Sequence, residues 1–373
     1  MKKLLIASDC FLPRWDGVAR FLSEIIPTLS KSFDITVIAP KYPGKLEEIP
    51  NIKLIRFDIS KKSYGDYTPP VVNNKIIKQE VLKADIVWTQ TIGPIGMSAI
   101  KYAKKLRKKL VSYIHSIEWE LFANSIKTEI WKTPVNIITT ILVRRLYNKC
   151  NLLMVPSTEI SELLSWQGIK TRKKVVHLGV DTEKFFPPIN KNDAKKKLNL
   201  EGKTVIGFVG RLGREKDLVT LYRAFARMQA KHKDAVLLIV GTGIDELKEL
   251  FQRRKNVILV GSTDNVVPYL QAMDIYVLPS LTETSSLSTM EAMACGLAVV
   301  STPVGYIKEY IQHGKNGLLF PKKNPYILMK RLEFLTDNPE IRLKMGEKAR
   351  STIVANYSWD KTVFEIEKIL EEL

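Results

Sequence analysis

The chain has 373 residues, of which 45% are hydrophobic, and its three cysteines lie far apart at Cys10, Cys150 and Cys295. This length suits two domains of roughly 150 to 200 residues each rather than a single one. The isolated cysteines argue against a disulfide framework or a zinc site, and no stretch reaches the ~18 apolar residues of a membrane span. The apolar run that begins at Lys3 stops at Asp9, so it predicts a first buried strand rather than a signal peptide. We expect a cytoplasmic protein, and we leave open a peripheral attachment to the inner face of the cell membrane.

The net charge of +19 is unevenly distributed along the chain. Residues 1–180 contain 29 Lys or Arg and 15 Asp or Glu, whereas the remainder contains 29 and 24. An excess of positive charge in one half indicates a polyanionic partner such as an anionic membrane surface or a phosphorylated acceptor. No nucleic-acid-binding motif accompanies the charge, so we expect no nucleic-acid partner. General solubility is the competing explanation.

The first half begins with a predicted βαβ unit. Residues 3–8 are an apolar strand, a loop and an amphipathic helix follow as far as Leu29, and residues 35–39 form the next strand. Gly17 lies where the loop meets the helix, where backbone N–H groups can approach a phosphate without a Cβ in the way. Asp16 precedes this glycine.

A second feature of the first half is a basic helix predicted over residues 99–110, where apolar residues recur at helical spacing. It is either a surface helix with a solvated basic face or an element that docks on a membrane surface. The basic face comprises Lys101, Lys104, Lys105, Arg107, Lys108 and Lys109.

The strand predicted at residues 111–114 ends at His115, a position from which the side chain points into a crevice rather than into the core. A long helix is predicted over residues 131–147, apolar enough to pack and too short to span a membrane. Pro187 and Pro188 then begin a linker toward the second half.

The second half opens with a strand at residues 205–209, a turn at 210–213 and a helix that begins near Lys216. The guanidinium of Arg211 and the ammonium of Lys216 lie on either side of this turn. Such a pair can bracket a diphosphate, because Arg supplies a fork of donors and Lys a point charge. Two surface cations at a helix start are the alternative.

The stretch 280–296 carries two carboxylates, Glu283 and Glu291, with hydroxyl residues between them. An apolar strand precedes it at residues 275–278, and a helix begins near Thr289. A loop of this kind lies at the carboxyl end of a strand, where open α/β sheets bind ligands, and the helix start offers unpaired N–H groups. The two carboxylates could therefore hold two parts of one polyhydroxylated ligand. For an isolated pair, a helix-cap neighbour and a solvated helix face would be the better explanation.

This glutamate pair, continued by AMACGLAVVSTPVG, resembles the donor-sugar motif of family 4 retaining glycosyltransferases. Other stretches resemble the same family in the same order: the strand that ends at His115, the GVDxxxF string at 179–185 and the G-R-x(4)-K spacing at 210–216. The resemblance implies an α/β fold of GT-B architecture, with two Rossmann-like domains that face each other across a cleft. The first would be an acceptor-binding domain of residues 1–180, on which a C-terminal helix of about 357–373 packs back. The second would be a donor-binding domain of residues 181–356.

The resemblance also implies roles for individual residues. His115 would lie near the donor sugar, Arg211 and Lys216 would neutralise the diphosphate, and Glu283 would hold the sugar; these four form the expected catalytic set. Glu291 would bind the ribose hydroxyls. The remaining donor-binding positions would be Gly17 in the first loop, Ser262 in the loop that frames the base, and the backbone of Ser285, Ser286 and Leu287.

The expected reaction is the transfer of a hexose from a UDP- or GDP-sugar to an acceptor hydroxyl with retention, and the acceptor could be a lipid or a lipid-linked glycan. Fixed cations would stabilise the leaving group, so we expect neither a metal nor another cofactor. Two alternatives are a nucleotide-sugar epimerase of the same architecture and a non-catalytic basic nucleotide-binding protein. The donor sugar, the base, the acceptor, the linkage and the oligomeric state stay open.

Overall fold

The computed structural model describes residues 1–373 except 15, 46–48, 63–66, 126–128 and 253. The chain divides into two compact units: unit 1 comprises residues 1–177 and 361–373, and unit 2 comprises residues 178–360. Each unit contains one parallel β-sheet with alternating helices, so the predicted α/β fold class is confirmed.

The sheet of unit 1 has seven strands in the described part of the chain, in the order β3-β2-β1-β4-β5-β6-β7. All neighbouring strands pair in parallel. The strands are β1 (Lys2–Ala7), β2 (Phe33–Pro40), β3 (Ile52–Phe57), β4 (Ile86–Thr89), β5 (Lys109–Tyr113), β6 (Leu152–Val155) and β7 (Lys173–Val175). Strands β4 and β6 are buried along their whole length, as parallel strands covered on both faces are.

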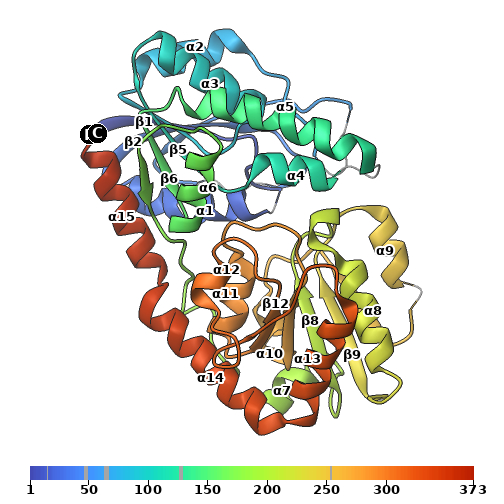
Figure 1. Cartoon of the computed structure of the whole chain (residues 1–373). Coiled ribbons are helices and arrows are strands. Elements are labelled where there is room, and N and C mark those ends of the chain that lie inside the picture. The colour runs from blue at the N-terminus through green and yellow to red at the C-terminus, as the bar shows by residue number, and fades with distance from the viewer. Residues whose placement is uncertain (15, 46–48, 63–66, 126–128, 253) are drawn as a thin grey trace. The chain divides into compact units, whose positions relative to one another are not determined.

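Helices cover both faces of this sheet. In Figure 1, α2, α3 and α5 lie on one face, and α1 and α15 on the other. The helices of unit 1 are α1 (Gly17–Leu29), α2 (Asn74–Lys83), α3 (Pro94–Lys105), α4 (Glu118–Ser125), α5 (Glu129–Tyr147), α6 (Thr158–Trp166) and α15 (Trp359–Glu371).

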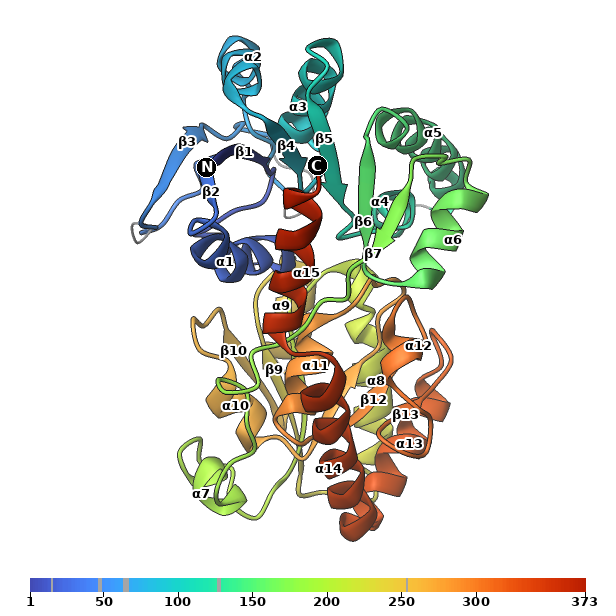
Figure 2. The same ribbon diagram turned by 90° about the vertical axis from the view of Figure 1, so that its left-hand side faces the viewer.

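Helix α15 brings the end of the chain back to unit 1. Within that unit, the Thr362 hydroxyl donates to the His177 carbonyl oxygen at 2.8 Å, and Lys2 Nζ donates to the Glu371 carbonyl oxygen at 2.7 Å. Figure 2 shows α15 beside α1 and below the sheet. The last residues of the chain therefore stabilise the first unit.

The structure corrects the predicted basic helix. Helix α3 ends at Lys105, Arg107 adopts a left-handed conformation (φ 53°), and Lys109 is already the first residue of β5. The N–H of Lys108 closes the turn by donating to the Ala103 carbonyl oxygen at 2.9 Å. Of the six basic residues expected on one helical face, only Lys101, Lys104 and Lys105 belong to the helix. The prediction failed because Leu110, which extended the helical spacing, is a buried strand residue.

The sheet of unit 2 has six strands in the described residues, in the order β10-β9-β8-β11-β12-β13. These are β8 (Thr204–Val209), β9 (Ala235–Val240), β10 (Val257–Gly261), β11 (Ile275–Leu278), β12 (Ala298–Ser301) and β13 (Leu318–Leu319). The chain moves outward from β8 to β10 and then returns to β11, so β8 and β11 are neighbours in the centre of the sheet.

In unit 2, α8, α9 and α13 lie on one face of the sheet, and α10, α11 and α14 on the other (Figure 1). The helical elements are α7 (Lys191–Lys196), the 3-10 turn η1 (Arg214–Lys216), α8 (Leu218–Met228), α9 (Asp245–Gln252), α10 (Val267–Ala272), α11 (Leu287–Ala294), α12 (Ile307–Tyr310), α13 (Pro325–Asp337) and α14 (Pro339–Asn356). Among the described residues, no helix combines the length and apolarity needed to cross a membrane.

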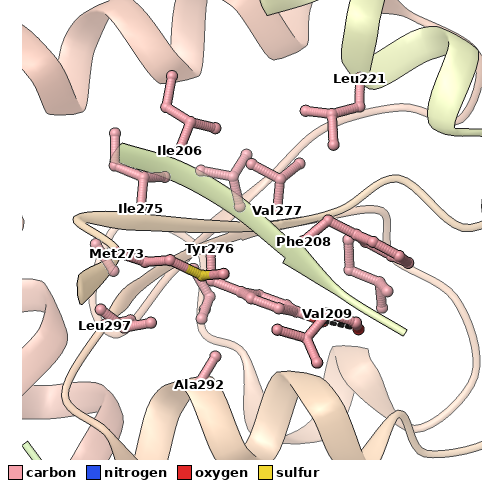
Figure 3. Close-up of a cluster of buried hydrophobic side chains, with 14 of the residues drawn as sticks. Ile206, Phe208, Val209, Leu221, Met273, Ile275, Tyr276, Val277, Ala292 and Leu297 are labelled. Atoms are coloured by element: carbon pink, nitrogen blue, oxygen red, sulfur yellow. Dashed lines mark hydrogen bonds between the residues drawn. The ribbon is translucent and has the colours of Figure 1, made fainter. Parts of the chain in front are cut away.

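The core of unit 2 fixes the strands that carry the candidate site. Side chains of β8 and β11, including Phe208 and Tyr276, are fully buried between helices on the two faces (Figure 3). Gly207 allows Met273 to pack on β8, since an added Cβ would lie 2.1 Å from the Met273 sulfur. Close packing of this kind holds the carboxyl ends of the two strands in a defined register.

Candidate active site

The first component of the site is the turn after β8. The chain leaves the strand at Gly210, and Arg211 precedes the 3-10 turn that ends at Lys216. Asp217 follows in a left-handed conformation (φ 46°, ψ 45°), and its carboxylate accepts from the Thr220 hydroxyl at 2.7 Å. The turn therefore needs a residue that tolerates positive φ, and Asp is among the few non-glycine residues that do.

The second component is the loop after β11, residues 279–286, which leads into α11. Because β8 and β11 are adjacent parallel strands, the two loops meet at the same edge of the sheet. The Leu281 N–H donates to the Glu215 carbonyl oxygen at 2.7 Å and joins them.

Side chains complete this junction. Lys216 forms an ion pair with Glu283, and the Ser280 hydroxyl donates to the same Glu283 carboxylate at 2.7 Å. Arg211 forms an ion pair with Glu215, whose side chain is only 4% exposed. The structure thus brings together Arg211, Lys216 and Glu283, three of the four residues expected to act in catalysis.

The first turn of α11 contributes hydroxyl groups and backbone N–H groups. Ser286 has a left-handed conformation (φ 57°), and its hydroxyl lies 2.8 Å from that of Thr289. The hydroxyl of Ser285 is buried and has no hydrogen-bond partner in the described residues. A buried polar atom without a partner is costly, which is the situation that a bound ligand would relieve. Leu287 is the first residue of the helix.

Glu291 lies further along α11 and is 1% exposed. The explanation that it belongs to a solvated helix face is therefore wrong. A carboxylate so deeply buried carries a large desolvation cost, and it is kept in such a place only when polar groups surround it.

Several residues that shape the site were not predicted. Gly305 has φ 53°, and an added Cβ there would lie 2.0 Å from the Glu283 carbonyl oxygen. The Tyr306 N–H donates to the Thr284 carbonyl oxygen at 2.8 Å, and the Tyr310 hydroxyl donates to the backbone carbonyl oxygen of Ser285 at 2.7 Å. The loop after β12 thus holds the Glu283 loop in place. The glycine at the end of AVVSTPVG is the signal that could have indicated this close approach.

Two glycines after β9 have a similar role at the Arg211 turn. An added Cβ at Gly241 would lie 2.0 Å from the Gly210 carbonyl oxygen, and one at Gly243 would lie 2.3 Å from that of Leu212. Two glycines directly after an apolar strand are a readable sign that another backbone approaches there.

Ser262 is placed apart from these residues. It is exposed and follows β10, which β9 separates from β8. Its assignment to a base-framing loop stays a prediction.

The first loop of unit 1 has its own anion at the helix start. The Asp16 carboxylate accepts from the N–H groups of Val18 and Ala19 at 3.0 and 2.9 Å and caps α1. Gly17 is exposed, and an added Cβ there would meet nothing within 4 Å. A phosphate at these two amides would have to displace the Asp16 carboxylate, so a phosphate role for Gly17 stays a prediction.

His115 lies just beyond β5, as expected. Its Nε2 is 2.8 Å from the Gln90 side-chain oxygen, and its ring packs against Phe21 and Tyr113 at centroid distances of 4.8 and 4.6 Å. Burial lowers the pKa of His115 to about 3. The imidazole is therefore neutral near pH 7 and can donate or accept a hydrogen bond there without adding charge.

Two buried carboxyl groups accompany His115 at this sheet edge. Asp9 accepts from the N–H groups of Ile95 and Gly96 at 2.8 and 3.1 Å, and burial raises its pKa. Glu118 accepts from the Tyr147 hydroxyl at 2.5 Å, and burial raises its pKa to about 7. Sequence reasoning missed both, because a single Asp or Glu beside an apolar run carries no sign of its burial.

No cluster of three or more His, Cys, Asp or Glu side chains in the described residues is arranged to hold a metal ion. The expectation of a metal-independent reaction stays a prediction.

Comparison with known proteins decides the family. Residues 190–352 match the family "Glycosyl transferases group 1", and residues 15–184 match "Glycosyltransferase Family 4". The chain belongs to the family 4 glycosyltransferases. It is an enzyme of the glycosyltransferase class, so the resemblance drawn from the motifs is confirmed.

This glycosyltransferase is similar over its whole length to an uncharacterized glycosyltransferase of Methanocaldococcus jannaschii, with 25% identity over 100% of this chain and 98% of the relative. It is 22% identical to the alpha-monoglucosyldiacylglycerol synthase of Acholeplasma laidlawii, over 96% and 94% of the two chains. Among solved structures, Anabaena HepE in complex with UDP and glucose matches with a TM-score of 0.83 and 18% identity over 100% of both chains. These likenesses confirm the predicted GT-B architecture as a two-domain α/β fold.

Proposed function

We propose that this glycosyltransferase moves a hexose from a UDP- or GDP-sugar to an acceptor hydroxyl with retention of configuration. The observation that carries the proposal is the meeting of Arg211, Lys216 and Glu283 at the carboxyl ends of β8 and β11. Two cations at one sheet edge, each already paired with a carboxylate, can exchange those partners for the two phosphates of a nucleotide diphosphate.

In this mechanism, fixed charges act on the leaving group. As the bond between the sugar and the diphosphate breaks, negative charge develops on the phosphate oxygens, and Arg211 and Lys216 stabilise it without moving far. Glu283, released from Lys216, accepts hydrogen bonds from sugar hydroxyls, while Glu291 binds the ribose. His115, neutral by burial, would approach the sugar as a hydrogen-bonding group. No metal is needed for this charge stabilisation.

The acceptor is proposed to be a lipid or a lipid-linked glycan. The name of the Acholeplasma relative describes synthesis of a glucosyl diacylglycerol, and the excess of positive charge in residues 1–180 suits an acceptor carried on an anionic surface. The basic residues first expected on one helix contribute to this charge, although only three of them lie on α3.

The first experiment is a thermal-shift screen of UDP, GDP and their hexose conjugates, with and without a metal chelator. A ligand that binds only the folded protein raises the unfolding temperature, so one nucleotide series is expected to stabilise the chain and the chelator to change nothing. The donor so identified is then incubated with lipid acceptors, and the anomeric configuration of the product is read by NMR. Inversion at the anomeric carbon would contradict the retaining mechanism. Conversion of the sugar nucleotide to an epimer without acceptor would contradict transfer itself.

A further inference from the structure

The outer face of α5 is unusually apolar. Every described side chain from Ile130 to Leu142 is at least partly exposed, and the end of the helix is anchored in the core by Val143, Leu146 and Tyr147. Helix α4 contacts the part before it, where the Asn136 side-chain amide donates to the Trp119 carbonyl oxygen at 3.4 Å. The large exposed apolar residues recur at helical spacing along one side, and we name them the α5 stripe: Ile130, Trp131, Ile137, Ile138 and Leu142. Trp131 and Ile138 are 62% and 66% exposed. An apolar strip this long is uncommon on a surface that faces only water, and it indicates an interaction site.

A second exposed tryptophan lies near the anchored end of α5. Trp166, at the end of α6, is 90% exposed. The α6 end meets α5 there: the Asn148 side-chain amide donates to the Gly168 carbonyl oxygen at 3.0 Å, and Gly168 lies against the Arg144 side chain. Tryptophan is enriched where one part of a residue is in an apolar phase and another part is in water, as at the boundary of a bilayer.

The charges along α5 show which kind of partner suits the stripe. From Trp131 to Tyr147 the sequence contains Lys132, Arg144 and Arg145 and no Asp or Glu. Arg144 and Arg145 are exposed and follow the stripe directly. Anionic lipid headgroups would pair with these arginines while the apolar side chains enter the acyl boundary, whereas a second copy of the helix carries one acidic residue, Glu129, against its three cations.

We infer that the α5 stripe, with Arg144 and Arg145 at its end, is a bilayer-docking surface that inserts shallowly into an anionic leaflet. The docking is mainly apolar, in contrast to docking through the basic residues near α3, which would be mostly electrostatic. The inference rests on the proposed function in one respect: an acceptor carried by a lipid would require the enzyme to reach the membrane surface. Vesicle binding can be measured without substrate, so a failure of this inference is distinguishable from a failure of the transfer reaction.

The test is flotation of the full chain with phosphatidylcholine vesicles, with or without phosphatidylglycerol, at low and high salt. The stripe variant combines Trp131→Ser, Ile138→Ser and Leu142→Ser. The matched control combines Leu343→Ser, Val354→Ser and Phe364→Ser, which are also exposed apolar residues, on α14 and α15. A third variant combines Arg144→Gln and Arg145→Gln.

We expect the wild type to float with anionic vesicles and the stripe variant to lose about tenfold or more of its partitioning, a loss that persists at high salt because apolar insertion is not screened. The control should stay within about twofold of the wild type. The arginine variant should lose binding mainly at low salt. Because the replaced stripe residues are exposed, the unfolding temperature should not change, which serves as the folding check.

Three results would overturn the inference: no vesicle binding by the wild type, equal binding by the wild type and the stripe variant, or a dimer in light scattering that the stripe variant disrupts while its vesicle binding is retained. The last would make the stripe a contact between copies of the chain. If the triple variant does not fold, quenching of tryptophan fluorescence by brominated lipid decides instead, in the wild type and in Trp131→Phe. A quenched component that disappears with Trp131 supports insertion, and identical quenching in the two proteins contradicts it.

Discussion

The polar groups at the carboxyl edges of the two sheets differ in their charge state. In unit 2, the polar groups at the edge are ionic and paired with one another, Lys216 with Glu283 and Arg211 with Glu215. In unit 1, burial acts against ionisation: the pKa of His115 falls to about 3 and that of Glu118 rises to about 7. The edge of unit 2 therefore carries ionic groups, and the edge of unit 1 carries neutral hydrogen-bonding groups near pH 7.

The paired cations also have an energetic consequence. Separating an ion pair leaves the carboxylate without its cation. A ligand that binds Arg211 and Lys216 must therefore stabilise these cations at least as well as the two carboxylates do. A monophosphate offers less charge than a diphosphate. We therefore expect the unit 2 edge to discriminate between nucleoside mono- and diphosphates through these pairs.

The largest effect is expected when a cation of unit 2 is removed. Arg211→Ala or Lys216→Ala should weaken binding of the nucleoside diphosphate by about 1.5–3 kcal/mol, the value of a lost charged hydrogen bond. Isothermal titration calorimetry measures this directly. Arg214→Ala is the matched control, because Arg214 lies in the same turn and pairs with Glu246 at 2.8 Å. Unchanged affinity in both the Arg211 and the Lys216 variants would show that the paired cations of unit 2 do not bind the diphosphate.

The two glutamates of the same edge should separate binding from turnover. Glu291→Ala is expected to lower affinity for the free nucleotide about tenfold, since hydrogen bonds to the ribose would be lost. Glu283→Gln keeps the size of the side chain and should mainly lower kcat, because the contacts proposed between Glu283 and the sugar would strengthen as the reaction proceeds. Steady-state kinetics and nucleotide titration distinguish the two. If both variants lose only thermal stability and keep full activity, the glutamates are structural.

The sequence predicted much of this arrangement and missed its pairing. The strand and helix pattern around Arg211 and around Glu283 was enough to place each of them in a loop at a sheet edge. It could not show that the loops touch, because that depends on β8 and β11 being neighbours although β9 and β10 lie between them in the chain. Glu215 was missed because it lies in a turn, and a turn has no periodic pattern from which the burial of a side chain could be predicted.

Two other misses come from helical spacing. The apolar spacing of residues 99–110 continued through Arg107 into a strand, because buried strand residues can match a helical pattern by chance. Helix α5 was predicted, but its exposed face was not, since a helix with apolar residues on several sides does not reveal which side the sheet covers.

The next prediction tests the neutral edge of unit 1 from the alkaline side. Because the folded-state pKa of Glu118 is raised, the unfolded chain loses this proton more readily than the folded chain between about pH 4.5 and 7. Stability from this group is fully present below that window and is lost as the pH rises through it. Glu118→Gln cannot ionise, so it should be more stable than the wild type at about pH 8, by up to about 3 kcal/mol, and not at about pH 4. Urea unfolding of both proteins at the two pH values measures the difference.

Glu120→Gln, on the same helix, serves as the control. A Glu118→Gln difference that does not change with pH would show that Glu118 loses its proton as readily in the folded chain as in the unfolded chain, so that its pKa is not raised.

His115 should give the opposite pH dependence and the smallest effect. Its folded-state pKa is depressed, so between about pH 6.5 and 3 the unfolded chain binds a proton that the folded chain does not. Its contribution is therefore present above pH 6.5 and is lost as the pH falls through that window. His115 is only partly buried, so we expect His115→Gln to remove less than about 1 kcal/mol of acid sensitivity, with little change near neutral pH.

Comparing urea unfolding of the variant and the wild type at about pH 5 and about pH 8 measures this, with His177→Gln as the control in the same unit. Equal acid sensitivity in His115→Gln and the wild type would mean that the imidazole binds a proton as readily in the folded chain as in the unfolded chain. Burial at the edge of unit 1 would then not act against ionisation of His115, and the contrast between the two sheet edges would be lost.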